Sequence, residues 1–176
     1  QRPERIAGHV PNDWGLMGYP NVWLGVSVEN QHFTWRLDHL LRIPAPVHFV
    51  SAAPLLKPLD LRLWLDAARC PAVGPAPERY RCGMPTAWHE PGEEHTALIP
   101  TGVRWFGRSQ LAWVIVGGES GGRPGHPPRP MELEWARSLR DECVAAGTPF
   151  FFKQWGGARP GGPALLDGRE WRQMPA

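Results

Sequence analysis

Residues 21–29 read NVWLGVSVE, an almost unbroken run of apolar and β-branched side chains. Three similar runs follow along the chain: VHFVSAA at 47–53, LAWVIVGGE at 111–119 and PFFFKQW at 149–155. Such runs indicate β-strands, and their nearly continuous hydrophobicity is typical of strands that are buried on both faces. The sequence therefore predicts four parallel strands, neighbours in one sheet, covered by helices.

Helical spacing between the runs supplies the crossovers that parallel strands require. After the first run, Pro44 and Pro46 end a helical pattern made of four apolar side chains: Phe33, Leu37, Leu40 and Leu41. Before the last run, a second pattern opens at Pro130, reaches its cap at Gly147 and places four side chains on one face: Trp135, Ala136, Leu139 and Cys143. Residues 2–10 and 59–68 are expected to form further helices, the first without a strand of its own.

Length and composition indicate a single α/β domain spanning residues 1–176, with 42% hydrophobic and 20% charged residues. A complete eight-stranded barrel needs roughly 200 residues or more. We therefore expect a partial (βα) barrel with about four parallel strands and flanking helices. Residues 70–108 carry several Pro and Gly and no sustained period, which predicts a loop-rich insertion. The pair Asp167-Gly168 predicts a hairpin turn in the tail.

The chain shows no sign of export or membrane insertion. It contains no run of about 18 apolar residues and no apolar signal core at its beginning. Its three cysteines are an odd number without the density of a disulfide scaffold. A cytoplasmic protein is expected. The net charge of +2 is too small to demand a nucleic-acid partner.

Polar side chains follow each predicted strand. Because the carboxyl ends of parallel strands meet at one edge of a sheet, these residues are expected to form a site there. Two carboxylates and an amine are the candidate catalytic residues: Glu29, Glu119 and Lys153. The candidate cofactor-binding residues are Ser27, Asn30, Ser51, Gly117, Gly118, Ser120 and Gln154. Alternatively, Glu29 and Lys153 pair with each other or with Arg residues.

The run GGESGG at 117–122 follows an apolar strand and lets the backbone approach a ligand closely. It has neither the GKS or GKT ending of a Walker motif nor the spacing of a dinucleotide fingerprint. A tight turn explains it equally well. No metal site is predicted, since the separations of Cys70, Cys82, His89 and His95 match no common zinc site.

Two further residue types are interpreted as packing residues. Cys143 lies on the apolar face of the helix that follows Pro130, which favours a core role over a nucleophilic one. The ten tryptophans invite comparison with platforms that stack nucleic-acid bases. However, Trp23, Trp113 and Trp135 fall within strand or helix patterns, and this favours packing.

Three of these motifs resemble, in the same order, the phage protein Gp-thirty-seven/Gp-sixty-eight family: NVWLGVSVEN at 21–30, WVIVGGESG at 113–121 and FFFKQWG at 150–156. Shorter matches are RPER at 2–5, FVS at 49–51, PLL at 54–56, RPM at 129–131 and DGREW at 167–171. The resemblance covers most of the chain outside the 70–108 insertion.

This resemblance implies a barrel-like α/β protein of phages and prophages with radical-SAM-like features. In full-length members, a cysteine-rich N-terminal loop would hold an iron–sulfur cluster and S-adenosylmethionine. The implied role is nucleic-acid modification or mobile-element defence, often beside a three-Cys-motif partner protein.

Two departures from the family pattern bear on activity. No cysteine-rich loop precedes Arg2, so we expect no cofactor in this chain alone. The second strand usually ends Ser-x-Glu-Pro in the family, whereas Ala53 precedes Pro54 here and removes a carboxylate from the expected site.

Two functional readings remain open. In the first, the chain is the C-terminal half of a radical-SAM-like barrel enzyme. In the second, it is a non-catalytic binding module that contacts nucleic acid or a partner protein, such as the N-terminal half or the three-Cys-motif protein. A half barrel leaves strand 21–29 as an open edge. The isolated chain is therefore expected to form a homodimer, to be poorly soluble, or to be shielded by its insertion.

Overall fold

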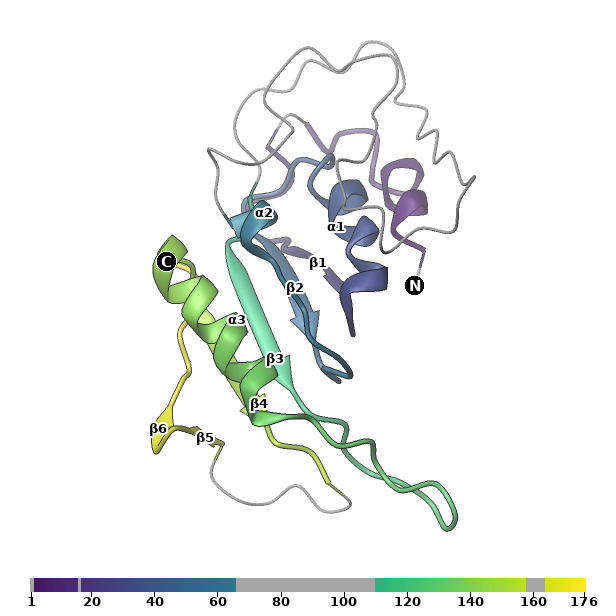
Figure 1. Ribbon diagram of the computed structural model, residues 1–176. Helices are drawn as coiled ribbons and strands as arrows, with labels where there is room; N and C mark the ends of the chain where they lie inside the picture. The colour runs from purple at the N-terminus through teal and green to yellow at the C-terminus, as the bar shows by residue number, and fades with distance from the viewer. Residues whose placement is uncertain (1, 16, 66–109, 158–163) are drawn as a thin grey trace, which may run out of the picture.

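The computed structural model describes residues 2–15, 17–65, 110–157 and 164–176. Its centre is a four-stranded sheet in the order β1-β2-β3-β4, and every neighbouring pair is parallel (Figure 1). The strands are β1 (Leu24–Ser27), β2 (His48–Ala52), β3 (Trp113–Gly117) and β4 (Phe150–Gln154). The α/β class and the parallel neighbours are confirmed. The insertion expected at 70–108 lies outside the described residues.

Three helices cover one face of this sheet: α1 (Trp35–Leu40), α2 (Arg62–Leu65) and α3 (Leu133–Ala146). Alternate strand residues point toward them and are buried: Val26, Val28, Val50, Ala52, Val114, Val116, Phe150 and Phe152. The helices contribute side chains to the same core, all of them fully buried: Leu37 and Leu40 from α1, and Ala136, Leu139 and Cys143 from α3. We call this side of the sheet the covered face.

The local signals predicted the helices well. Gly147 caps α3 in the left-handed conformation at φ 68°, and its N–H donates to carbonyl oxygens of the last turn. The helix expected at 2–10 is a short 3₁₀ helix, η1 (Pro3–Gly8), and a second one, η2 (Gln31–Phe33), precedes α1. Of the helix expected at 59–68, the described part is α2.

A C-terminal hairpin packs beside α3 and β4. Its strands, β5 (Leu165–Leu166) and β6 (Arg169–Glu170), pair antiparallel. They are joined by Asp167 and Gly168 at φ 53° and 75°, which confirms the predicted turn. After the hairpin, the N–H of Phe152 donates to the carbonyl of Trp171 at 2.8 Å, so the tail covers the outer edge of β4. β1 forms the opposite edge of the sheet.

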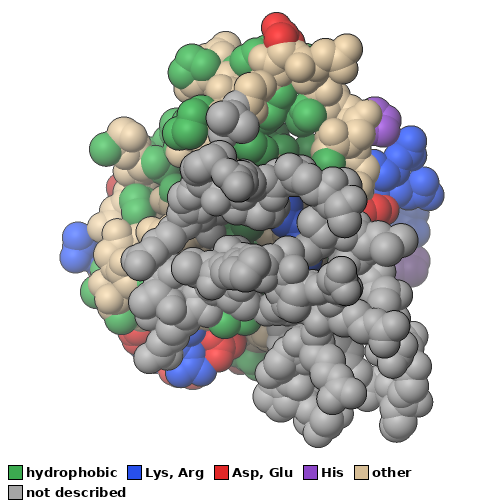
Figure 2. Space-filling model, turned by 90° about the horizontal axis from the view of Figure 1, so that it is seen from above, with side chains coloured by type: hydrophobic (Ala, Val, Ile, Leu, Met, Phe, Trp, Pro, Cys, Tyr) green, Lys and Arg blue, Asp and Glu red, His purple; other side chains and the backbone are tan. Residues whose placement is uncertain are grey.

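The prediction that the strands are buried on both faces is wrong for the second face. There the alternate residues Phe49, Ser51, Trp113, Ile115 and Phe151 are half-buried, and Trp23 is 39% exposed. Seen from the amino ends of the strands, hydrophobic side chains reach the surface and most charged ones lie along the rim (Figure 2). In the described part of the chain, no helix has the length and apolarity needed to cross a membrane.

Candidate functional site

The second face of the sheet carries a cluster of aromatic rings. We call it the open face and define it by ten residues: Trp23, Gly25, Ser27, Phe49, Ser51, Trp113, Ile115, Gly117, Phe151 and Lys153. Trp113 lies at the centre of the cluster. Its ring centroid is 5.9 Å from those of Phe49 and Phe151 and 6.0 Å from that of Trp23. The rings thus meet in one cluster, which we call the aromatic platform, and Trp113 stands nearly perpendicular to Trp23 and Phe151.

Gly25 makes room for this platform. A Cβ atom at Gly25 would stand 2.3 Å from the Phe49 ring, so the ring lies directly against the backbone of β1. Gly25 and Phe49 are register partners, and so are Phe49 and Trp113. Glycine weakens a strand interior, and a common reason for its presence is close approach of another group.

Toward the carboxyl ends of the strands, the open face becomes polar. Ser27 and Ser51 are register partners in the next row, and both are half-buried. Beyond them, the register between β3 and β4 shifts between Val116 and Gly117. Lys153 is therefore an extra residue in β4, a bulge of the kind that redirects a side chain.

The amine of Lys153 makes the polar end of the open face cationic. Its Cβ lies 3.3 Å from the position that a Cβ on Gly117 would take, so the two residues share this side of the sheet. The side chain is exposed, and it forms no hydrogen bond or ion pair in the described part of the chain. An anion bound at this end of the open face would find an uncompensated positive charge.

Glu29 is held by an arginine, as one of the two sequence interpretations predicted. Nη1 of Arg36 donates to the Glu29 carboxylate at 2.9 Å and to the Ser27 carbonyl at 2.7 Å. The Arg36 side chain is only 9% exposed and stacks on Phe33, 4.2 Å from the ring centroid. This contact fixes the end of β1 to the start of α1. A catalytic role for Glu29 stays a prediction.

Glu119 is held by a different arginine, Arg129. The Arg129 guanidinium donates to both carboxylate oxygens, at 2.6 and 2.9 Å, and its backbone N–H donates at 2.7 Å. These bonds hold the pKa of the Glu119 carboxyl at about 2. Glu119 therefore stays ionised at neutral pH and ties the two ends of the segment between β3 and α3 together.

The glycine run after β3 packs against the segment after β4. A Cβ on Gly118 would stand 1.9 Å from the Trp155 carbonyl oxygen, and one on Gly156 would stand 2.4 Å from that of Glu119. The N–H groups of Gly118 and Gly121 donate to the carbonyls of Gln154 and Gly157. The glycines thus have a packing role that needs no ligand. A cofactor-binding role for Gly117, Gly118, Ser120 and Gln154 stays a prediction.

The structure places the predicted site residues at one edge, since all four strands are parallel and end there. The surroundings of these residues differ, however. Asn30 accepts a hydrogen bond from the His32 N–H and caps η2. Glu29 and Glu119 are neutralised by Arg36 and Arg129, whereas Ser27, Ser51 and Lys153 share the open face.

Sequence reasoning missed the aromatic platform. Trp113 was interpreted as a packing residue, but it is half-buried on the open face and donates its indole N–H to the Gln173 carbonyl at 2.9 Å. The available signal was the two-residue period, which puts Gly25, Phe49 and Trp113 on the same side of their strands once the register is known.

No described residues form a metal site. Cys143 is fully buried among apolar side chains, and this burial raises the pKa of its thiol far above the ordinary value. The core role predicted for Cys143 is consistent with that position. Cys70, Cys82, His89 and His95 lie outside the described residues.

Comparison with known proteins assigns the family. Residues 1–175 match a family described as "Protein of unknown function (DUF5131)". The chain belongs to this family. No curated protein and no solved structure matches it significantly. The membership covers almost the whole sequence, and it says nothing by itself about the reaction, the ligand or the phage origin that the resemblance implies.

Proposed function

We propose that the open face binds single-stranded nucleic acid, with unpaired bases stacked on the aromatic platform and a phosphate group beside Lys153. The observation that supports this proposal is the joint presence, on one sheet face, of half-buried rings and an amine that has no partner among the described residues. Sheet faces that present aromatic side chains are a recurrent solution for binding unstacked bases.

The chemistry of the open face favours a nucleotide over a purely apolar partner. Rings such as Trp113 offer flat π surfaces on which any base can stack. The Ser27 and Ser51 hydroxyl groups offer donors and acceptors in the next row. Lys153 offers the point charge that suits a phosphate. A nucleotide has the matching order of base, sugar and phosphate, which correspond to the rings, the hydroxyl groups and the amine of the open face.

The described residues do not fit an iron–sulfur cluster. Such a cluster requires a set of cysteine thiolates. Cys143 is the one cysteine within the described ranges, and it is buried beneath α3. We therefore derive no catalytic step through a cluster and propose a binding function.

The proposal is tested by fluorescence anisotropy with a labelled 20-nucleotide single strand, as RNA and as DNA, and with a matched duplex. Trp113→Ala is expected to weaken binding of the single strand about five- to 150-fold, since a stacked base contributes about 1–3 kcal/mol. Lys153→Gln is expected to weaken binding a few-fold and to reduce its salt dependence. Because Lys153 is exposed and has no bonding partner in the part of the chain that the structure describes, this variant should fold normally.

The control is Trp35→Ala, which removes a tryptophan of α1 that is 39% exposed, as Trp23 of the open face is. It should bind the single strand like the unmodified protein. Equal binding of duplex and single strand, or equal losses in Trp113→Ala and Trp35→Ala, would contradict the proposal.

A further inference from the structure

The segment between β3 and α3 forms an extended arm at the carboxyl edge of the sheet. We define the arm as residues 120–130. It runs out beyond the ends of β3 and β4 and returns to α3 (Figure 1). Near its tip, the backbones of Arg123 and His126 exchange two hydrogen bonds, at 2.8 and 3.2 Å. Pro124 and Gly125, the latter at φ 79°, form the turn between them.

The arm is held at its base and stiffened along its length. The pair Glu119–Arg129 closes the base, and Ser120 bridges to Gly157 in the segment after β4. Four prolines fix backbone dihedrals within the arm: Pro124, Pro127, Pro128 and Pro130. A preorganised arm loses less conformational entropy on binding than a loosely held loop of the same length.

The charge of the arm is positive and largely uncompensated. Between Glu119 and Glu132 the sequence contains no acidic residue, and it contains two arginines and a histidine. Arg129 is neutralised by Glu119. The side chains of Arg123 and His126 form no hydrogen bond or ion pair with any residue that the structure describes. Both are exposed near the tip.

The arm also borders an open hollow of about 640 Å³ that is lined by residues from both of its limbs, among them Arg123, His126 and Arg129. With the Glu119 charge cancelled, the hollow carries the net positive charge of Arg123. A guanidinium and an imidazole facing such a hollow are common donors to phosphate oxygens.

We propose that the arm binds the sugar-phosphate backbone of the nucleic acid, with Arg123 as the main phosphate contact and His126 beside it. The inference rests on the proposed function and deepens it, because the arm leaves the sheet at the carboxyl edge, where Lys153 also lies. In this arrangement, one continuous strand places its bases on the aromatic platform and its phosphates along the arm.

The experiment measures the dissociation constant of the labelled single strand between 50 and 300 mM salt. Each phosphate contact contributes about 0.7 to the slope of log affinity against log salt for a single strand. Arg123→Gln is expected to reduce the slope by about that amount, and Arg123→Lys is expected to retain it. The matched control is Arg5→Gln, which removes another exposed arginine, from η1, the element packed on α1.

The outcomes separate this inference from the proposed function. If Trp113→Ala weakens binding while Arg123→Gln leaves the slope unchanged, the arm is not a phosphate contact and the stacking proposal stands. If Arg123→Gln lowers the slope while Trp113→Ala binds normally, the arm inference stands and stacking fails. Absence of binding by the unmodified protein overturns both. A slope lowered equally by Arg5→Gln shows a nonspecific effect of net charge and overturns the arm inference.

Discussion

The two faces of the sheet are built from alternate residues of the same four strands, yet their compositions differ. The covered face consists of Val, Ala and Phe side chains that are almost fully buried. The open face combines two glycines, two serines, half-buried aromatic rings and a lysine in a bulge. A β-rich core needs none of these features. Gly25 weakens a strand, and half-exposed rings leave apolar surface in contact with solvent.

This difference indicates which face folding requires and which face is available for binding. Departures from good packing are concentrated at functional sites, because residues that are selected for binding need not stabilise the fold. The buried side chains of the covered face stabilise the fold enough for it to tolerate these departures. The predictions below test this division with changes made in pairs, one on each face.

The largest effect is expected at three consecutive phenylalanines in β4. Phe152 is 1% exposed on the covered face, whereas its neighbour Phe151 is half-buried on the open face. Phe152→Ala should lower the free energy of unfolding by about 3–5 kcal/mol because it leaves a cavity. Phe151→Ala should lower it by about 1 kcal/mol, since solvent fills the space. Urea denaturation of both variants measures the difference, and equal losses would show that the open face is packed like a core.

A smaller effect is expected when volume is added to each face. Ala52→Leu forces side-chain atoms into the core between β2 and the helices and should cost about 2 kcal/mol. Gly25→Ala meets only the outer atoms of the Phe49 ring, which can swing toward the open side, and should cost less than about 1 kcal/mol. The fluorescence of Trp113, 5.9 Å from that ring, should change in Gly25→Ala. A cost above that of Ala52→Leu would mean that Phe49 is fixed in place.

The sequence predicted those parts of the fold that local signals specify. Pro130, the apolar face around Leu139 and the cap at Gly147 define α3 without reference to any other element. Asp167-Gly168 defines its turn in the same way. Apolar runs also located the four strands, because parallel strands are hydrophobic along most of their length.

The rest depended on pairing that a single sequence does not show. Phe151 and Phe152 are the same type of residue. Only the packing of the helices on the sheet distinguishes a ring in the core from a ring on the aromatic platform. Lys153 becomes a bulge only through the register between β3 and β4. The role of Gly118 depends on the approach of Trp155, which is 37 residues away in the sequence.

The sequence predicted where the candidate residues lie in the sheet, and their catalytic and cofactor-binding roles stay predictions. Polar residues at the carboxyl edge follow from parallel topology. Pairing of Glu29 with an arginine could be named only as an alternative, and pairing of Glu119 with Arg129 was not predicted, because each depends on the path of a connection. The aromatic platform required the register of three strands.

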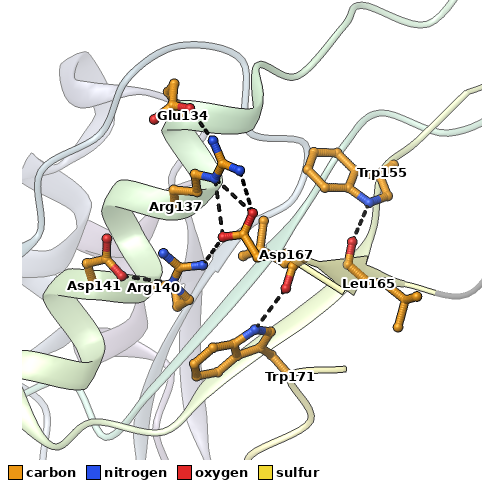
Figure 3. A network of polar contacts seen from close by, with 9 residues as sticks. Glu134, Arg137, Arg140, Asp141, Trp155, Leu165, Asp167 and Trp171 are labelled. Carbon is orange, nitrogen blue, oxygen red and sulfur yellow. Dashed lines mark hydrogen bonds and ion pairs between the residues drawn. The ribbon is translucent and has the colours of Figure 1, made fainter. Parts of the chain in front are cut away.

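The smallest effect is expected where the C-terminal hairpin contacts α3 through ion pairs. Asp167, in the turn of the C-terminal hairpin, accepts hydrogen bonds from Arg137 and Arg140 of α3, and Arg137 also pairs with Glu134 (Figure 3). These bonds hold the pKa of the Asp167 carboxyl at about 2. The indole N–H of Trp155, which follows β4, donates to the Leu165 carbonyl and further attaches the hairpin, and the indole N–H of Trp171 donates to the Leu166 carbonyl within the C-terminal segment.

Asp167→Asn keeps a residue type that tolerates the positive φ of this turn and removes only the charge. Because the pKa is lower in the folded than in the unfolded chain, the carboxylate stabilises the fold above pH 4, and this contribution is lost as the pH falls through about 2. The difference in unfolding free energy between Asp167→Asn and the unmodified protein should therefore be constant from pH 5 to 7 and vanish toward pH 2. The neighbouring change Leu166→Ala, at a fully buried side chain, should cost about 2–4 kcal/mol at every pH. Urea denaturation at each pH compares the two. An Asp167→Asn deficit that matched the Leu166→Ala deficit would mean that the ion pairs and not the buried leucine attach the hairpin to α3. A deficit that grew as the pH fell would mean that these ion pairs do not lower the pKa of the Asp167 carboxyl in the folded protein.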